Sequence, residues 1–88
     1  MDELWDYYRG RLNERVDELR ALQPIETHDD AIRRVAHQLR GTGASYGFHA
    51  VSEAAGAVED AAPEALAEAL ETLIGVLRRE AATEGRPG

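Results

Sequence analysis

The chain has 88 residues, a net charge of −7 and no cysteine. This length allows one small domain with a single core. The acidic balance disfavours nucleic-acid binding, because a phosphate backbone would be repelled, and the lack of cysteine excludes disulfides and Cys-based zinc sites. There is no apolar run of about 20 residues, and the acidic, aromatic start is unlike a signal peptide, so we expect a cytoplasmic protein without a membrane span.

Residues 3–22 are predicted to form an amphipathic helix. Apolar side chains recur every three or four positions, at Leu4, Tyr8, Leu12, Val16 and Leu19, with Trp5 and Leu22 at the margins. Gln23-Pro24 should end this helix, because proline cannot continue the hydrogen-bond ladder and moves the residue before it out of the α region.

Residues 27–45 are predicted to form a second helix, with Thr27 as its N-cap. Asp29 and Asp30 would then lie in the first turn, where the helix dipole favours negative charge. The apolar stripe of this helix consists of Ile32, Val35, Ala36 and Leu39.

Residues 48–60 are predicted to form a third helix, which must pack closely because its apolar face is mostly alanine. Pro63 suits the first position of a fourth helix that runs to about Ala82. The core positions expected in these two helices are Val51, Ala54, Ala55, Val58, Leu66, Leu70, Leu73, Ile74 and Leu77.

Four amphipathic helices with short links and no strand pattern predict an all-α fold, an antiparallel up-down four-helix bundle. Residues 1–84 would form the bundle, and residues 85–88 would form a flexible C-terminal tail. Four helices in one chain favour a monomer. The initial Met and the soft tail favour a free-standing protein over a domain of a hybrid or chemotaxis-type kinase.

The second helix presents a histidine on its exposed face. On a wheel of about 100° per residue, His37 lies about 140° from the start of the buried stripe. Arg33 and Gly41 lie one turn to either side, and Arg40 and Ala44 share the surface. The two arginines could stabilise an anion at the ring by charge-assisted hydrogen bonds. An exposed imidazole is largely neutral and nucleophilic at pH 7.

Two glycines in this helix each cost about 1 kcal/mol relative to alanine, so they need a compensating reason. A side chain at Gly41 would crowd His37, and its absence would leave the ring open to a bulky partner. Alternatively, Gly41 and Gly43 allow close helix packing, and His37 is an ordinary surface residue.

Two other kinds of site are weighed and set aside. The spacing of the possible ligands is poor for a metal, so no metal is expected. Ser45 and His37 have no obvious acid to complete a hydrolase triad. The possible metal ligands are His28, Asp29, Asp30, His37 and His49.

Residues 37–48, HQLRGTGASYGF, resemble the signature of histidine phosphotransfer (HPt) domains. That signature is a histidine, an apolar residue two on, a basic residue three on, glycine four on, a small polar residue eight on and glycine ten on. Every position is filled. Ala36 before the histidine and Val58-Glu59 in the third helix also fit the family.

The resemblance implies that His37 is a phosphoacceptor. Its Nε2 would attack the phospho-aspartate of a receiver domain and later pass the phosphoryl group to another receiver's aspartate. Arg40 occupies the position usually held by lysine, near the phosphoryl group, and Gly41 matches the clearance glycine. The receiver would supply Mg²⁺ and most of the catalysis, so we expect no cofactor in this chain and no independent enzymatic turnover.

Three further residues receive roles on this interpretation. In chemotaxis-type kinases, a glutamate at the spacing of Glu59 hydrogen-bonds the other ring nitrogen and fixes the tautomer. The alternative for Glu59 is a solvated acid at a helix end or a partner for a nearby arginine. Arg33 and Ala44 are assigned to the surface that docks a receiver.

The expected partners are response-regulator receiver domains and a sensor histidine kinase. One alternative is a docking module that binds a receiver or kinase without carrying phosphate. Another is a purely structural bundle or dimerisation domain, in which His37 would be dispensable.

Overall fold

The structure is a computed structural model that describes the backbone of residues 2–82 and the side chains of residues 6–82. Its first helix, α1, spans Asp2–Arg20. Leu12, Val16 and Leu19 are buried, as predicted. The side chains of Leu4 and Trp5 lie outside the described residues. The helix ends before Pro24 is reached, because the N–H of Leu22 turns back to the Leu19 carbonyl at 3.1 Å.

The second helix, α2, spans Asp29–Tyr46 and follows a short 3₁₀ helix, η1, at Ile25–Thr27. The prediction that Thr27 is the N-cap is wrong. His28 occupies that position, and the Thr27 hydroxyl instead donates to the Pro24 carbonyl at 3.0 Å. The predicted stripe of α2 is buried throughout, at Ile32, Val35, Ala36 and Leu39.

A left-handed glycine ends α2. Gly47 has φ of 84°, a conformation that glycine adopts without the steric cost a Cβ would add. Its N–H bonds to the Gly43 carbonyl, and the N–H of Phe48 bonds to the same carbonyl at 2.8 Å. This cap turns the chain sharply into α3, which spans His49–Asp60.

The fourth helix, α4, spans Leu66–Ala82. Pro63 was expected to open it, and instead opens a 3₁₀ turn, η2, at Pro63–Ala65 that leads directly into α4. Residues 83–88, which include the predicted tail, lie outside the described residues.

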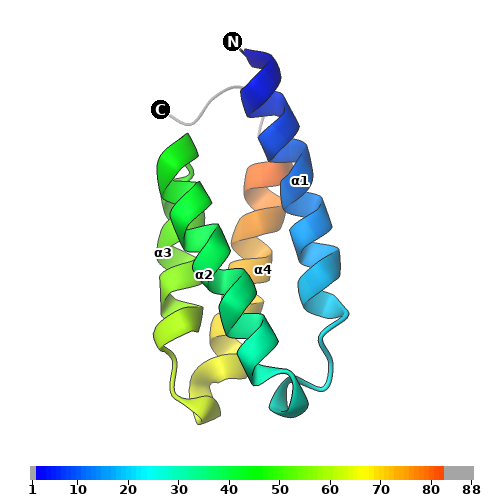
Figure 1. Cartoon of the computed structure of the whole chain (residues 1–88), viewed down its shortest axis with the longest axis vertical. Coiled ribbons are helices and arrows are strands. Elements are labelled where there is room, and N and C mark those ends of the chain that lie inside the picture. Colours follow the sequence, from blue (N-terminus) through cyan, green and yellow to red (C-terminus); the bar gives the residue numbers. More distant parts are fainter. Residues whose placement is uncertain (1, 83–88) are drawn as a thin grey trace.

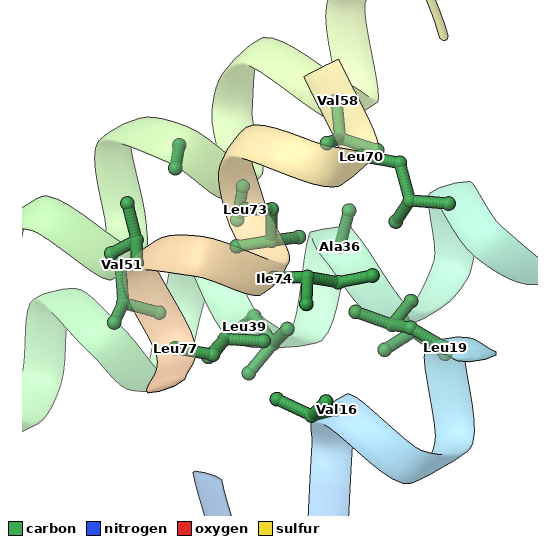
Figure 2. Packing of buried hydrophobic residues seen from close by; sticks show 14 of the residues in the cluster. Val16, Leu19, Ala36, Leu39, Val51, Val58, Leu70, Leu73, Ile74 and Leu77 are labelled. Atoms are coloured by element: carbon green, nitrogen blue, oxygen red, sulfur yellow. The ribbon is translucent and has the colours of Figure 1, made fainter. Parts of the chain in front are cut away.

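The described residues form an all-helical bundle and contain no strand. In Figure 1 the four helices lie side by side along the long axis, and the chain reverses direction at each connection. Figure 2 shows the apolar side chains that meet between them. All core positions predicted for α3 and α4 are buried, and Phe48, which was not predicted, joins them at 1% exposure.

Close approach of α2 and α3 depends on Gly43. A Cβ at this position would lie 3.0 Å from the Ser52 backbone nitrogen and 3.1 Å from the Phe48 carbonyl oxygen. Both are backbone atoms, which cannot move aside cheaply. Gly43 therefore lets α3 lie against α2, and this contact places the end of α3 beside the exposed face of α2.

Candidate functional site

His37 projects from the middle of α2 into solvent. Its side chain is 73% exposed, while Ala36 and Leu39 on the opposite face are almost completely buried. The helical wheel therefore placed the ring correctly.

Glu59, in the last turn of α3, reaches across to the imidazole. Its Oε2 lies 2.6 Å from His37 Nδ1. Hydrogen bonds from His37 and Arg40 lower the pKa of the Glu59 carboxyl, so it is ionised near neutral pH and can only accept. The ring hydrogen therefore belongs on Nδ1, and Nε2 of the neutral imidazole keeps its lone pair and faces away from Glu59.

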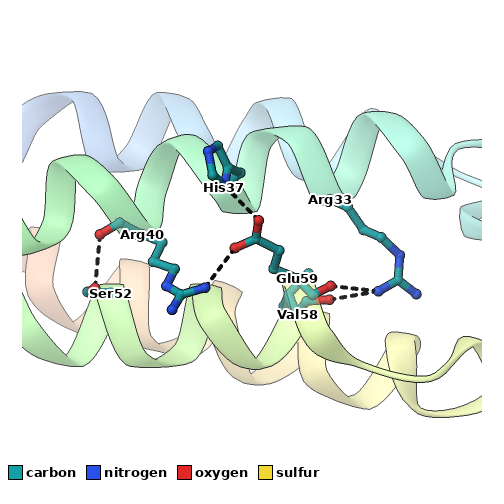
Figure 3. Close-up of polar contacts among 6 residues, drawn as sticks. All are labelled: Arg33, His37, Arg40, Ser52, Val58 and Glu59. Carbon is teal, nitrogen blue, oxygen red and sulfur yellow. Dashed lines mark hydrogen bonds and ion pairs between the residues drawn. The ribbon is translucent and has the colours of Figure 1, made fainter.

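Arg40 is bound to the second oxygen of the same carboxylate. Its Nη1 lies 3.2 Å from Glu59 Oε1, and its side chain is 54% exposed. Figure 3 shows Glu59 between His37 and Arg40, with one oxygen directed at each. The carboxylate thus holds a nucleophile and a cation on the same surface.

Arg40 is positioned by two residues of α3 that were not predicted from the sequence, Ser52 and Gly56. The Ser52 hydroxyl donates to the Arg40 carbonyl at 2.9 Å. A Cβ at Gly56 would lie 3.7 Å from Arg40 Cδ, so the arginine stem crosses α3 at this glycine. Positions 52 and 56 hold small residues and share one helix face with Glu59. This spacing was the feature of the sequence that could have pointed to them as neighbours of the site.

Gly41 and Ala44 lie beside the imidazole on open surface. A Cβ at Gly41 would meet nothing within 4 Å, in contrast to Gly43. Both residues line an open hollow together with His37, Arg40 and Ser52. Of the two reasons considered for the glycines, helix packing applies to Gly43, and packing within the described chain does not explain Gly41.

Arg33 lies on α2 one turn before His37, but its guanidinium is directed away from the ring (Figure 3). Nε and Nη2 donate to the Asp29 carboxylate at 2.7 and 3.3 Å. The hydrogen bond to Asp29 raises the pKa of the Arg33 guanidinium above its ordinary value. The structure thus brings His37, Arg40, Gly41, Ala44 and Glu59 together and places the Arg33 charge elsewhere.

Neither a cluster of metal ligands nor a membrane-spanning helix is found in the described part of the chain. Among the side chains that the structure describes, those of residues 6–82, no group of three or more His, Asp or Glu is placed to hold a metal ion. Among the described helices, none is both long and apolar enough to cross a membrane.

The fold and the site define a small helical bundle that presents one exposed histidine with a carboxylate on its Nδ1 and a guanidinium beside it. The profile of the Hpt domain family matches residues 3–84. The chain therefore belongs to the histidine phosphotransfer (Hpt) domain family, whose members act in phosphorelays with kinases and receiver domains. Comparison with curated proteins found no match, and neither did comparison with solved structures.

Proposed function

We propose that this chain is a phosphorelay carrier in which His37 accepts a phosphoryl group from a receiver phospho-aspartate, or from a kinase, and passes it to a receiver aspartate. Its scaffold is a monomeric, antiparallel up-down bundle that has no turnover of its own. The observation that supports this most directly is the contact of 2.6 Å between Glu59 and His37 Nδ1, since it leaves Nε2 exposed and nucleophilic.

The transfer step needs little from this chain beyond the nucleophile. The Nε2 lone pair attacks phosphorus, the P–O bond to the aspartate breaks, and the aspartate carboxylate leaves with the bonding electrons. The proton stays on Nδ1, so positive charge develops on the ring, and Glu59 stabilises it as a carboxylate does beside other catalytic histidines. The receiver supplies Mg²⁺ to the transferring group.

Arg40 and Gly41 serve the phosphoryl group and the partner. Arg40 is exposed, and one hydrogen bond links its guanidinium to Glu59, so it can turn toward a phosphoryl group on Nε2 and neutralise its charge. Gly41 keeps the approach to Nε2 open for the receiver, and Ala44 continues that low surface.

Transfer of label tests the proposal. A receiver domain carrying radioactive phosphate should pass label to the wild-type protein and to His49→Gln, an exposed-histidine control, but not to His37→Gln. The label should be acid-labile and base-stable. Equal labelling of His37→Gln would contradict the proposal. So would receiver binding without any phosphohistidine across a panel of receivers, which is the outcome expected of a docking module.

A further inference from the structure

The last turn of α3 has no basic side chain of its own to offset its negative charge. The last carbonyls of a helix have no partner within the helix, and the helix dipole makes this end negative. Residues 57–60 are Ala, Val, Glu and Asp, so the last turn adds two acids and no base. A cation from outside the helix would therefore stabilise this turn.

Arg33 of α2 supplies that cation. Its Nη1 donates to the carbonyls of Val58 at 3.2 Å and of Glu59 at 3.0 Å. The Val58 carbonyl also accepts from the Ala61 N–H at 3.3 Å, whereas the Glu59 carbonyl accepts only from Arg33 among the described residues. Arg33 therefore caps α3 from the neighbouring helix.

Asp29 fixes the direction of this cap. It binds Nε and Nη2 of Arg33 through both carboxylate oxygens, which leaves Nη1 directed at α3. The Arg33 side chain is only 23% exposed. The Arg33 guanidinium is held on one side by a carboxylate and on the other by two carbonyls, so it has little freedom to turn toward solvent.

Glu59 is consequently held at both ends. Arg33 binds its backbone carbonyl, and His37 and Arg40 bind its carboxylate (Figure 3). A carboxylate can orient an imidazole only if its own backbone stays in place. Without Arg33 the last turn of α3 can fray, and Glu59 would then leave Nδ1 for part of the time.

We propose that Arg33 is a positioning residue that acts on His37 through Glu59, by capping the end of α3. The proposal rests on His37 being the phosphoacceptor. It replaces the expectation that Arg33 belongs to the receiver-docking surface, and the two roles have different kinetic consequences. A positioning residue sets the reactivity of Nε2 and therefore the maximal rate of transfer, whereas a docking residue sets the apparent KM for the receiver.

The first test is spectroscopic and needs no partner. In ¹⁵N NMR spectra of the unphosphorylated protein, His37 of the wild type should be in the Nδ1–H tautomer. Arg33→Ala should shift it toward the Nε2–H form, in the same direction as Glu59→Gln, and Arg33→Lys should be intermediate because an ammonium restores the charge but not the fork. The exposed control Arg78→Ala, on α4, should leave the tautomer unchanged. An unchanged tautomer in Arg33→Ala would overturn the proposal.

The second test is kinetic and uses a double-mutant cycle. Arg33→Ala should lower the maximal rate of transfer from a phosphorylated receiver by about threefold to tenfold with an unchanged KM. In the Glu59→Gln background the same change should have no further effect, because its target is gone. A raised KM with an unchanged maximal rate, or an equal loss in both backgrounds, would overturn the proposal.

Two controls separate other causes. Val16→Ala, a core truncation on α1, should lower stability without moving the His37 tautomer, which excludes general destabilisation as the source of the effect. If the wild type accepts no phosphoryl group, the carrier function fails, and the tautomer measurement still decides whether Arg33 positions Glu59.

Discussion

At the scale of single residues, the site depends on one carboxylate whose two oxygens bind two different side chains. Glu59 binds His37 with one and Arg40 with the other. The motif singled out His37 and Arg40 by their spacing, and it offered pairing with the ring as one of the roles open to Glu59. The structure shows that pairing and also one of the alternatives, a bond to a nearby arginine. The target of Arg33 could not be predicted, since its carbonyl acceptors lie 25 and 26 residues away and depend on where α3 ends against α2.

Acid titration should reveal the bonding of Glu59. Its pKa lies below the ordinary 4.5, so as the pH falls below that value the unfolded chain takes up the proton first and the folded state loses stability relative to it. The stability difference between wild type and Glu59→Gln in urea unfolding should therefore be full at pH 7 and smaller at pH 3. Glu71→Gln, at an exposed acid on α4, is the matched control. A constant difference between wild type and Glu59→Gln would show that the bonds to Glu59 do not form.

Arg40 should govern how long the phosphohistidine survives. On the proposed function, Arg40→Ala would remove the charge-assisted hydrogen bonds to the phosphoryl group, and we expect the lifetime of the phosphohistidine in the isolated protein to fall by about tenfold. The half-life of the label after the receiver is removed measures this directly. Arg34→Ala, an exposed arginine on the same helix, is the matched control. If both variants keep the wild-type half-life, Arg40 is only a surface partner of Glu59.

At the scale of helices, the apolar stripes were predictable because burial follows a period of 3.6 residues. Helix ends were harder to predict, since they depend on local turns. Thr27 has a side chain suited to an N-cap, yet it lies in the 3₁₀ helix η1, and α2 starts after His28. The sequence alone also could not separate the two glycines of α2, because only the packing of α3 distinguishes them.

Substituting these glycines should produce opposite effects on stability. Gly41→Ala should stabilise the fold by up to about 1 kcal/mol, because alanine is the better helix former and the space is open. We nevertheless expect slower transfer, because the added methyl group would lie on the surface beside His37 that the receiver has to approach. Gly43→Ala should destabilise by about 1–3 kcal/mol through its clash with the backbone of α3.

Chemical denaturation and transfer kinetics on the same two variants check this pair. A Gly41→Ala protein that is both stabler and as fast as wild type would remove the clearance role of Gly41. A Gly43→Ala protein as stable as wild type would contradict the close approach of α2 and α3.

At the scale of the whole molecule, the bundle distinguishes one of three histidines. His28 lies at the start of α2, where its Nδ1 contacts the Pro24 carbonyl and the Thr27 hydroxyl. His49 is exposed at the start of α3. In the described part of the chain, only His37 has a carboxylate on its ring, because the last turn of α3 places Glu59 beside the exposed face of α2 at this point.

The site of phosphorylation within the molecule tests the account most directly. The protein, phosphorylated by a receiver domain, should be examined by ³¹P and ¹⁵N NMR to locate the N–P bond. We predict a single phosphohistidine, at His37, with phosphorus on Nε2 and hydrogen on Nδ1 facing Glu59. Phosphorus on Nδ1 of His37, or on either of the other two histidines, would contradict it.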